Sequence, residues 1–273
     1  MIRDITLGQY FAADSVIHKL DPRGKILLLI MYIVALFMAD SFFSYLFLAV
    51  TVVTFVILSK IPLRMYLRGL RPLLIIILLT AILNIFFSSG NVVFSFWIIK
   101  ITDRGIINAV SMISRIFMLV IVTSMLTYTT SPIVLTSGLE RLLSPLQKIK
   151  IPVHEFSMML TIALRFIPTI LEETDKIMNA QKARGADFES GNLVKRAKAL
   201  VPIIIPLFIS AFRRADELAV AMECRCYSGN SSSRTRYIRY RFKTSDFVAF
   251  VILAAMIAGV VFLNTLKIGF LGI

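Results

Sequence analysis

Long apolar runs separated by short basic stretches are the feature that most limits what this chain can fold into. The apolar runs are residues 26–39, 42–58, 72–87, 106–128 and 247–263. A helix needs about 20 residues, in a range of about 17–25, to cross a bilayer. The sequence therefore predicts about five transmembrane helices, and the first and third runs must borrow flanking residues to span.

The composition excludes two other classes of protein. Of 273 residues, 58% are hydrophobic and only 17% are charged, whereas soluble proteins average about 45–50% apolar and about 25% charged residues. This excess of apolar residues excludes an ordinary soluble enzyme. The 21 Phe exclude a disordered chain. Two Cys are too few for a disulfide framework or for a zinc site made of Cys alone, and two His are too few for a His-rich metal site.

The positions of the Lys and Arg residues predict the orientation in the membrane. The net charge is +14, and the basic residues concentrate in 1–25, 59–71 and 129–245, which fall on one side if five spans alternate. Because cytoplasmic segments carry the excess of Lys and Arg, we expect the N-terminus and 129–245 in the cytoplasm and the C-terminus outside. The basic excess then reflects this bias and contact with lipid headgroups, and nucleic acid is not an expected partner.

The predicted organisation has three parts and is all-α. Residues 1–128 hold four spans, 129–245 form a cytoplasmic insert of amphipathic helices, and 246–273 hold the last span and an outer tail. Apolar residues at three- and four-residue steps predict helices at 132–143, 153–183 and 193–222 in the insert. The loop 88–105, which contains the β-branched and aromatic stretch 92–101, predicts a small strand or hairpin at the outer surface.

Prolines inside the two long predicted helices indicate bends. Pro168 lies in the first, and Pro202 and Pro206 lie in the second. An interior proline removes a backbone hydrogen bond and kinks the helix. Bent amphipathic helices suit a surface that grips a partner, and they also suit a helical domain that folds on itself against lipid. Arg165, three residues before Pro168, is expected to bond the carbonyls that the proline frees.

Each long helix ends in an Arg between small residues, Ala183-Arg184-Gly185 in the first and Cys224-Arg225-Cys226 in the second. Gly185 is a natural helix stop. Small neighbours leave the guanidinium free to project, and its five fixed donors recognise carboxylates bidentately. Two such ends suggest docking on a pair of related partners. The alternative interpretation is that each Arg is only a cation at a helix C-terminus, where the helix dipole favours positive charge by about 0.3–1 kcal/mol.

The sequence resembles the transmembrane T component of an energy-coupling factor (ECF) transporter, an ABC importer of vitamins or metals. The resemblance is strongest in 164–168, 180–185 and 221–227, and includes 14–25, 101–105 and 129–132. It implies a multi-pass protein of a prokaryotic cell membrane that links a substrate-binding membrane subunit, the S component, to two cytoplasmic ABC-type ATPases. The motifs that dock on the ATPase pair, homodimeric or heterodimeric, then match Ala183-Arg184-Gly185 and Cys224-Arg225-Cys226.

The resemblance also implies the roles of neighbouring residues. The second motif departs from the family pattern, which more often has Ala before and Gly after the Arg. Glu223, Arg165 and the three helix prolines support the docking helices, which we call the coupling helices. The chain itself binds no cofactor and catalyses no reaction: ATP and Mg²⁺ are used by the ATPases. The chain contains no phosphate-binding G-x-x-x-x-G-K-[ST] sequence.

Arg115 lies well inside the fourth predicted span. A charge at membrane depth is costly and is a functional candidate by default, although it can equally serve packing within the helix bundle. The alternative function is a stand-alone secondary transporter or channel, which usually carries acidic groups at midmembrane or inverted repeats. The predicted spans carry no Asp or Glu in their interiors. A membrane enzyme is disfavoured because no reactive cluster is evident.

Overall fold

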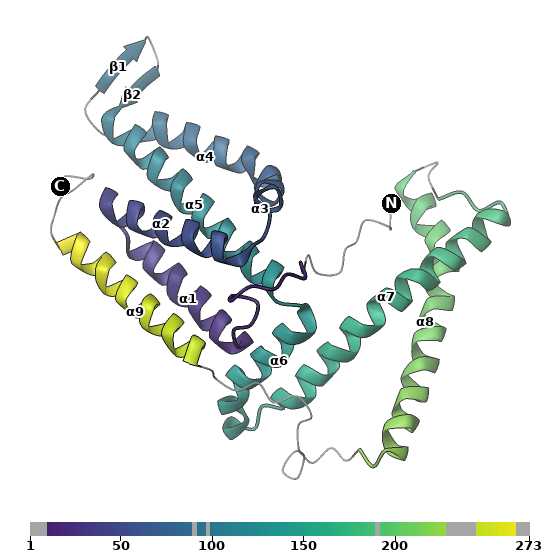
Figure 1. The fold of residues 1–273 in the computed structure, drawn as a ribbon. Coiled ribbons are helices and arrows are strands. Elements are labelled where there is room, and N and C mark those ends of the chain that lie inside the picture. The colour runs from purple at the N-terminus through teal and green to yellow at the C-terminus, as the bar shows by residue number, and fades with distance from the viewer. Residues whose placement is uncertain (1–9, 89–91, 97–98, 189–191, 228–243, 266–273) are drawn as a thin grey trace. The chain divides into compact units, whose positions relative to one another are not determined.

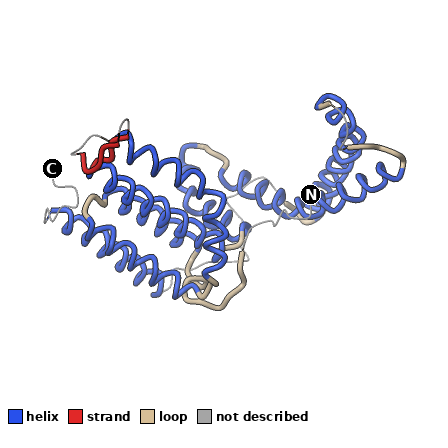
Figure 2. Tube along the Cα trace, turned by 90° about the horizontal axis from the view of Figure 1, so that it is seen from above, coloured by secondary structure: helices blue, strands red, loops and turns tan. Residues whose placement is uncertain are grey.

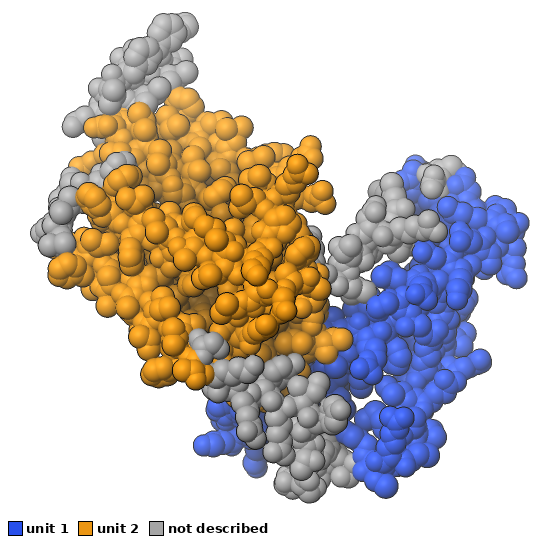
Figure 3. Space-filling view, in the orientation of Figure 1, with its two compact units in different colours: residues 1–7, 143–239 blue, residues 8–142, 240–273 orange. Residues whose placement is uncertain are grey.

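The computed structural model describes residues 10–88, 92–96, 99–188, 192–227 and 244–265. Their regular secondary structure is helical, apart from one two-stranded hairpin, and loops and turns connect the elements (Figures 1 and 2). One compact unit contains helices α1 to α6 and α9, and a second unit contains α7 and α8 (Figure 3). The predicted outer tail after the last span lies beyond residue 265 and so outside the described residues.

The first unit is a bundle of apolar helices. Helices α1, α2 and α9 lie side by side, and α5 contacts α1, α2, α3 and α4 (Figure 1). Its helices are α1 (Pro22–Met38), α2 (Phe42–Ser59), α3 (Leu63–Leu70), α4 (Leu74–Phe87), α5 (Asp103–Thr129), α6 (Pro132–Leu143) and α9 (Thr244–Thr265). The antiparallel strands β1 (Val92–Phe96) and β2 (Ile99–Thr102) form the predicted hairpin between α4 and α5 (Figure 2).

Four helical segments are long and apolar enough to cross a membrane: Phe42–Ser59, Leu63–Phe87, Asp103–Thr129 and Asp246–Thr265. This confirms an all-α, multi-pass membrane protein. The first predicted span, 26–39, falls on α1, whose 17 residues are at the lower limit for crossing a bilayer. Asp21 caps α1 through its side chain, and Pro22 occupies the first helical position.

The basic segment 59–71, expected as a connection between two spans, is mostly helical. Helix α3 continues through one 3₁₀ turn at Arg71–Leu73 into α4, so the third span borrows these residues and reaches 25 residues. Tyr66 and Leu70 are buried four residues apart on one face, while Arg64 and Arg68 are exposed. The arginines interrupt the apolar run, so an amphipathic helix here does not show as part of a continuous apolar span.

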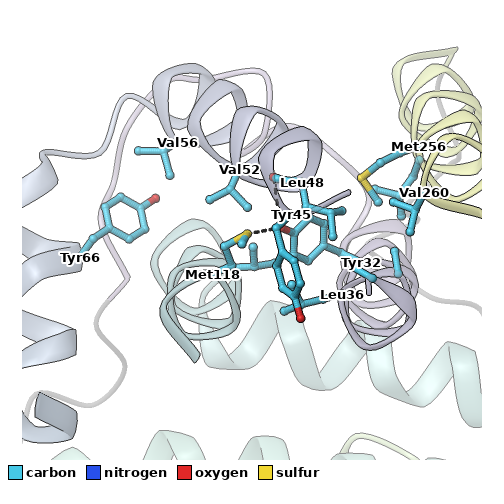
Figure 4. Packing of buried hydrophobic residues seen from close by; sticks show 14 of the residues in the cluster. Tyr32, Leu36, Tyr45, Leu48, Val52, Val56, Tyr66, Met118, Met256 and Val260 are labelled. Atoms are coloured by element: carbon cyan, nitrogen blue, oxygen red, sulfur yellow. Dashed lines mark hydrogen bonds between the residues drawn. The ribbon is translucent and has the colours of Figure 1, made fainter. Parts of the chain in front are cut away.

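The core of the first unit is assembled around Tyr32 of α1. Its ring packs among residues of α2, α5 and α9, including Leu48, Met118 and Val260 (Figure 4). The Tyr32 hydroxyl donates to the carbonyl of Leu48 at 3.3 Å. Because a buried hydroxyl without a partner destabilises a fold, this bond lets a tyrosine serve as a large core residue.

Buried polar groups tie together the starts of α1 and α9 and the end of α5. The carboxylate of Asp246, 1% exposed, accepts from the backbone N–H of Asp21 at 2.8 Å. The Lys25 ammonium donates to the carbonyls of His18 (3.2 Å) and Thr129 (3.0 Å) and to the Thr130 hydroxyl (3.1 Å). Buried charges of this kind require full hydrogen bonding, so this cluster fixes where three helices meet.

Helix α6 belongs with the membrane helices by its packing. A Cβ at Gly138 would lie 3.0 Å from Cβ of Pro22, so the glycine lets α6 approach the start of α1 closely. The boundary between the two units falls at Leu142, whereas the sequence places the start of the insert at residue 129. The difference is the length of α6, whose bounds are those predicted.

The second unit consists mainly of two long helices, α7 (Val153–Ala183) and α8 (Leu193–Cys224), preceded by a 3₁₀ segment at Ser144–Ile149. Helix α7 has the predicted bounds, and α8 runs two residues past its predicted end. Both helices continue through their interior prolines, Pro168, Pro202 and Pro206. The two helices pack on each other within this unit, and much of their apolar surface remains exposed.

The buried cluster makes a testable prediction. Replacing Asp246 by Ala removes the acceptor of a buried N–H and is expected to destabilise the chain by about 1–3 kcal/mol. Thermal unfolding of the full chain in mild detergent measures this as a lower midpoint. Asp14→Ala is the matched control, because Asp14 makes only an exposed ion pair with Lys19, and its midpoint should equal that of the parent. Equal midpoints for both variants would contradict the assignment.

Candidate functional site

Arg184 is the residue at which α7 ends. The N–H of Gly185 donates to the carbonyl of Lys182 at 2.9 Å, and the N–H of Ala186 donates to the carbonyl of Gln181 at 3.0 Å. These two bonds define a Schellman motif, which requires a left-handed residue after the helix. Gly185 supplies it with φ = +88°. Arg184 is exposed.

Arg225 occupies the same position at the end of α8. The N–H of Cys226 donates to the carbonyl of Glu223 at 2.8 Å, and the N–H of Tyr227 donates to the carbonyl of Met222 at 3.0 Å. Cys226 adopts the left-handed conformation, with φ = +57°. The two long helices therefore end in the same backbone motif, with an arginine at the equivalent position of each. Glu223 contributes its backbone carbonyl, which accepts the bond from Cys226.

Both guanidiniums are available to a partner. Neither Arg184 nor Arg225 has a side-chain hydrogen bond or ion pair with another described residue, and both are exposed. The small residues on either side, Ala183, Gly185, Cys224 and Cys226, are exposed as well. The two thiols are free. Since each Schellman motif already provides partners for terminal carbonyls, these arginines are not needed to cap their own helices.

The structure places the predicted supporting residues in helical positions. Pro168, Pro202 and Pro206 are exposed inside α7 and α8. Arg165 is exposed and makes no hydrogen bond within the described residues, so the expected bond to carbonyls near Pro168 is not formed.

Arg115 serves the bundle. From α5 its guanidinium donates to the carbonyl of Ala39, at 3.3 Å, and to the hydroxyl of Tyr45, and it lies 5.6 Å from the centroid of the Phe37 ring. Asn264 of α9 donates to the carbonyl of Met38. The two side chains thus provide partners for carbonyls at the end of α1, which supports the packing role rather than a direct part in transport.

Sequence reasoning missed a polar contact between the two long helices. Glu173 of α7 accepts from the hydroxyl of Ser210 at 2.6 Å and pairs with the guanidinium of Arg214, both on α8. The signal that could have found it is a spacing: Arg184 follows Glu173 by as many residues as Arg225 follows Arg214. Among the described residues, no group of three or more His, Cys, Asp or Glu could hold a metal ion.

These features define a multi-pass, all-helical membrane protein with an appended pair of long amphipathic helices that end in exposed arginines. The chain belongs to the CbiQ family, described as cobalt transport proteins, whose model matches residues 13–237. It is a transmembrane component of the energy-coupling factor type, as the names of its relatives state.

Curated relatives match nearly the whole chain. A protein of Ruminiclostridium cellulolyticum is 53% identical over 246 residues, which cover 90% of this chain and 92% of that protein. A protein of Thermosediminibacter oceani is 52% identical over 258 residues, covering 94% and 97%, and one of Bacillus subtilis is 41% identical over 261 residues, covering 94% and 98%. Each is named "Energy-coupling factor transporter transmembrane protein EcfT".

The second helix end makes a testable prediction. A non-glycine residue in the left-handed region costs about 1–2 kcal/mol, so Cys226→Gly should stabilise the last turn of α8 by about 1 kcal/mol. Hydrogen–deuterium exchange at the Tyr227 amide should slow accordingly. Cys226→Ala keeps the backbone strain and removes only the thiol, so its exchange rate should match the parent. Equal rates in the Gly and Ala variants would show that Cys226 is unstrained.

Proposed function

We propose that this chain is the coupling subunit of an ATP-driven importer. It binds two cytoplasmic ABC-type ATPases through Arg184 and Arg225 and an S component through its exposed apolar surfaces. The partner ATPases bind and hydrolyse ATP with Mg²⁺, and this chain transmits their movement without catalysing a reaction. The family description supports transport of a metal ion such as cobalt, and the relatives' names support an energy-coupling factor transporter. The cargo that we propose is a small nutrient, either a vitamin or a metal ion.

The observation that carries this proposal is the equivalence of the two helix ends. Two copies of one docking device suit two related partner subunits, as a pair of ATPases would be. Arginine is among the residues most enriched at interface hot spots, because its planar fork forms several directional hydrogen bonds. An exposed guanidinium at a fixed backbone position loses less conformational freedom on binding than one on a frayed helix end.

The exposed apolar surface of α8 supports a membrane-embedded partner. Val201, Ile205, Phe208 and Phe212 recur at steps of four, three and four residues and are 46–63% exposed. Residues at this spacing share one face of a helix. A continuous apolar stripe of this kind marks an interaction surface for protein or lipid, and an S component helix fits it as a groove-and-ridge partner.

The orientation follows from the basic residues. The segments before α1, around α3 and after α5 hold most of the Lys and Arg, so we place the N-terminus, α7 and α8 in the cytoplasm and the C-terminus outside. In this arrangement, closure of the ATPase pair on ATP moves the two arginines and the helices that carry them. Movement of α7 and α8 then reaches the S component through the apolar surface.

Charge reversal tests the docking role. Arg184→Glu combined with Arg225→Glu should abolish capture of co-expressed ABC-type ATPases from mild detergent, since loss of one hot-spot arginine costs about 2 kcal/mol or more. Arg196→Glu combined with Arg213→Glu is the matched control. It makes the same change in net charge on exposed residues of α8 and should leave capture unchanged. Membrane insertion should be normal in both variants.

Capture that survives the reversal at residues 184 and 225 would refute the docking assignment. Ion-driven uptake of a radiolabelled nutrient by the purified chain alone in liposomes would favour the alternative, a secondary transporter. A stand-alone transporter needs polar groups at membrane depth. The acidic residue Asp246 lies in the first turn of α9, at the end of the span, and its carboxylate accepts a bond from the backbone N–H of Asp21. It is therefore not a polar group at membrane depth.

A further inference from the structure

The contact between Glu173 and α8 is bipartite and partly shielded from water. One carboxylate oxygen of Glu173 accepts from the hydroxyl of Ser210 at 2.6 Å, and the other pairs with the Arg214 guanidinium. The side chains of Arg214 and Glu173 are 31% and 24% exposed. Charge-assisted hydrogen bonds to both oxygens fix a carboxylate in direction as well as distance. We call Glu173, Ser210 and Arg214 the clamp.

The clamp lies at the same distance along each helix from the two docking arginines. Arg184 follows Glu173 by eleven residues, and Arg225 follows Arg214 by eleven residues. Eleven helical residues span about 16 Å and about three turns, so each arginine lies on nearly the same face of its helix as its clamp residue. We call residues 173–184 along α7 and 214–225 along α8, each with its terminal arginine, the two arms. They have equal length and start at the same polar contact.

The two arms also repeat in sequence. Residues 173–185 and 214–226 align without a gap, with identical residues at three equivalent positions and a similar branched residue at a fourth. The identical pairs are Asp175 and Asp216, Ala180 and Ala221, and Arg184 and Arg225, and the similar pair is Ile177 and Leu218. At the first position, Glu173 in one arm corresponds to Arg214 in the other, so the repeat pairs with itself through opposite charges.

The surroundings of the clamp allow the helix crossing to turn. A cavity of about 40 Å³ lies beside it, lined by Phe166, Ile170, Leu207 and Ala211 together with the two charged side chains. Apolar contacts are non-directional, and a void at a helix crossing leaves room for small sliding movements. The ion pair is directional and holds one point of the crossing while the apolar contacts around it shift.

We propose that Glu173 and Arg214 are positioning residues that hold the crossing point of the coupling helices and thereby fix the spacing between Arg184 and Arg225. This inference rests on the proposed function for the role of the two arginines. A rotation about the clamp displaces both arginines by equal amounts because the arms are equal. The clamp therefore converts a symmetric movement of two ATPases into one change of crossing angle, which is the small shear or hinge motion seen in other switching proteins.

Distances between spin labels on the two arms test the clamp. Nitroxide labels are placed at Asn179→Cys and Val220→Cys, which are exposed and each precede a docking arginine by five residues. The background carries Cys224→Ser and Cys226→Ser, and pulsed electron paramagnetic resonance is recorded on the full chain in lipid nanodiscs. The parent should give one narrow distance distribution, and Glu173→Gln or Arg214→Gln should broaden it.

The chain offers matched controls beside each clamp residue. Glu172→Gln and Arg213→Gln change the same residue types at exposed neighbouring positions and should leave the distribution narrow. The swapped pair, Glu173→Arg with Arg214→Glu, restores opposite charges and should narrow it again. If a single variant loses helix content by circular dichroism, the swapped pair decides. Two results would contradict the role of the clamp. One is a distance distribution in the swapped pair that is as broad as in the single variants, and the other is a distribution in a single variant that is as narrow as in the parent.

A second measurement separates this inference from the proposed function. In complexes with captured ATPases, Mg-ATP should shift the label distance of the parent as one population, and Glu173→Gln should retain capture while its shifted population is broad. An unbroadened shift in Glu173→Gln overturns the positioning role. If neither the labelled parent nor the chain with its native Cys224 and Cys226 captures an ATPase, the proposed function fails, and the measurement on the chain alone still decides whether the clamp sets the spacing of the arms.

Discussion

The last carbonyl groups of a helix lack hydrogen-bond partners within that helix. In this chain, the groups that donate to these carbonyls differ between helices, and this difference decides whether a nearby arginine is used inside the protein. At the end of α1 the cap residue Ala39 is extended, with φ = −78° and ψ = 117°, so the backbone does not form a closing turn of the kind that ends α7 and α8. Side chains from other helices, Arg115 and Asn264, supply the missing donors. At the ends of α7 and α8 the backbone supplies them itself. Among the described residues, nothing engages the guanidiniums of Arg184 and Arg225.

The need for hydrogen-bond partners at helix ends also explains why polar contacts join the helices of the membrane unit at both ends of the bundle. Lys25 and Asp246 gather the starts of α1 and α9 and the end of α5, while Arg115 and Asn264 hold the turn between α1 and α2. Between these layers the core is apolar and centred on Tyr32. Polar contacts at both helix ends and an apolar core between them stabilise this bundle as one unit.

Periodicity and apolar length predicted most of the fold. The bounds of α6 and α7 are those read from the sequence, because Pro132 starts one helix and Gly185 stops the other, and both residues act locally. Helix α3 was missed because its arginines interrupt the apolar pattern, while burial of Tyr66 and Leu70 depends on α5 nearby. Local signals fix helix ends, and tertiary partners decide whether a mixed segment becomes a helix.

The candidate site divides in the same way. The two arginine motifs are local in sequence and could be found from it, including the departure at Cys226, whose left-handed backbone takes the place that Gly185 holds in α7. The bonds of Arg115, the solvent exposure of Arg165 and the pairing of Glu173 with Arg214 depend on side chains from other elements or on open surface. These contacts needed the structure, and they separate a structural arginine, Arg115, from two arginines that have no side-chain partner among the described residues.

Site-specific photocrosslinking in the assembled transporter tests the central claim most directly. A photoreactive amino acid at position 183 or 224 stands beside one docking arginine and leaves that arginine in place. The account predicts that each single label yields an adduct with one ATPase and that the double label yields one chain joined to two ATPases. Adducts formed only with lipid or only with this chain itself would contradict it. A double label that joins the chain to one ATPase and never to two would contradict it as well.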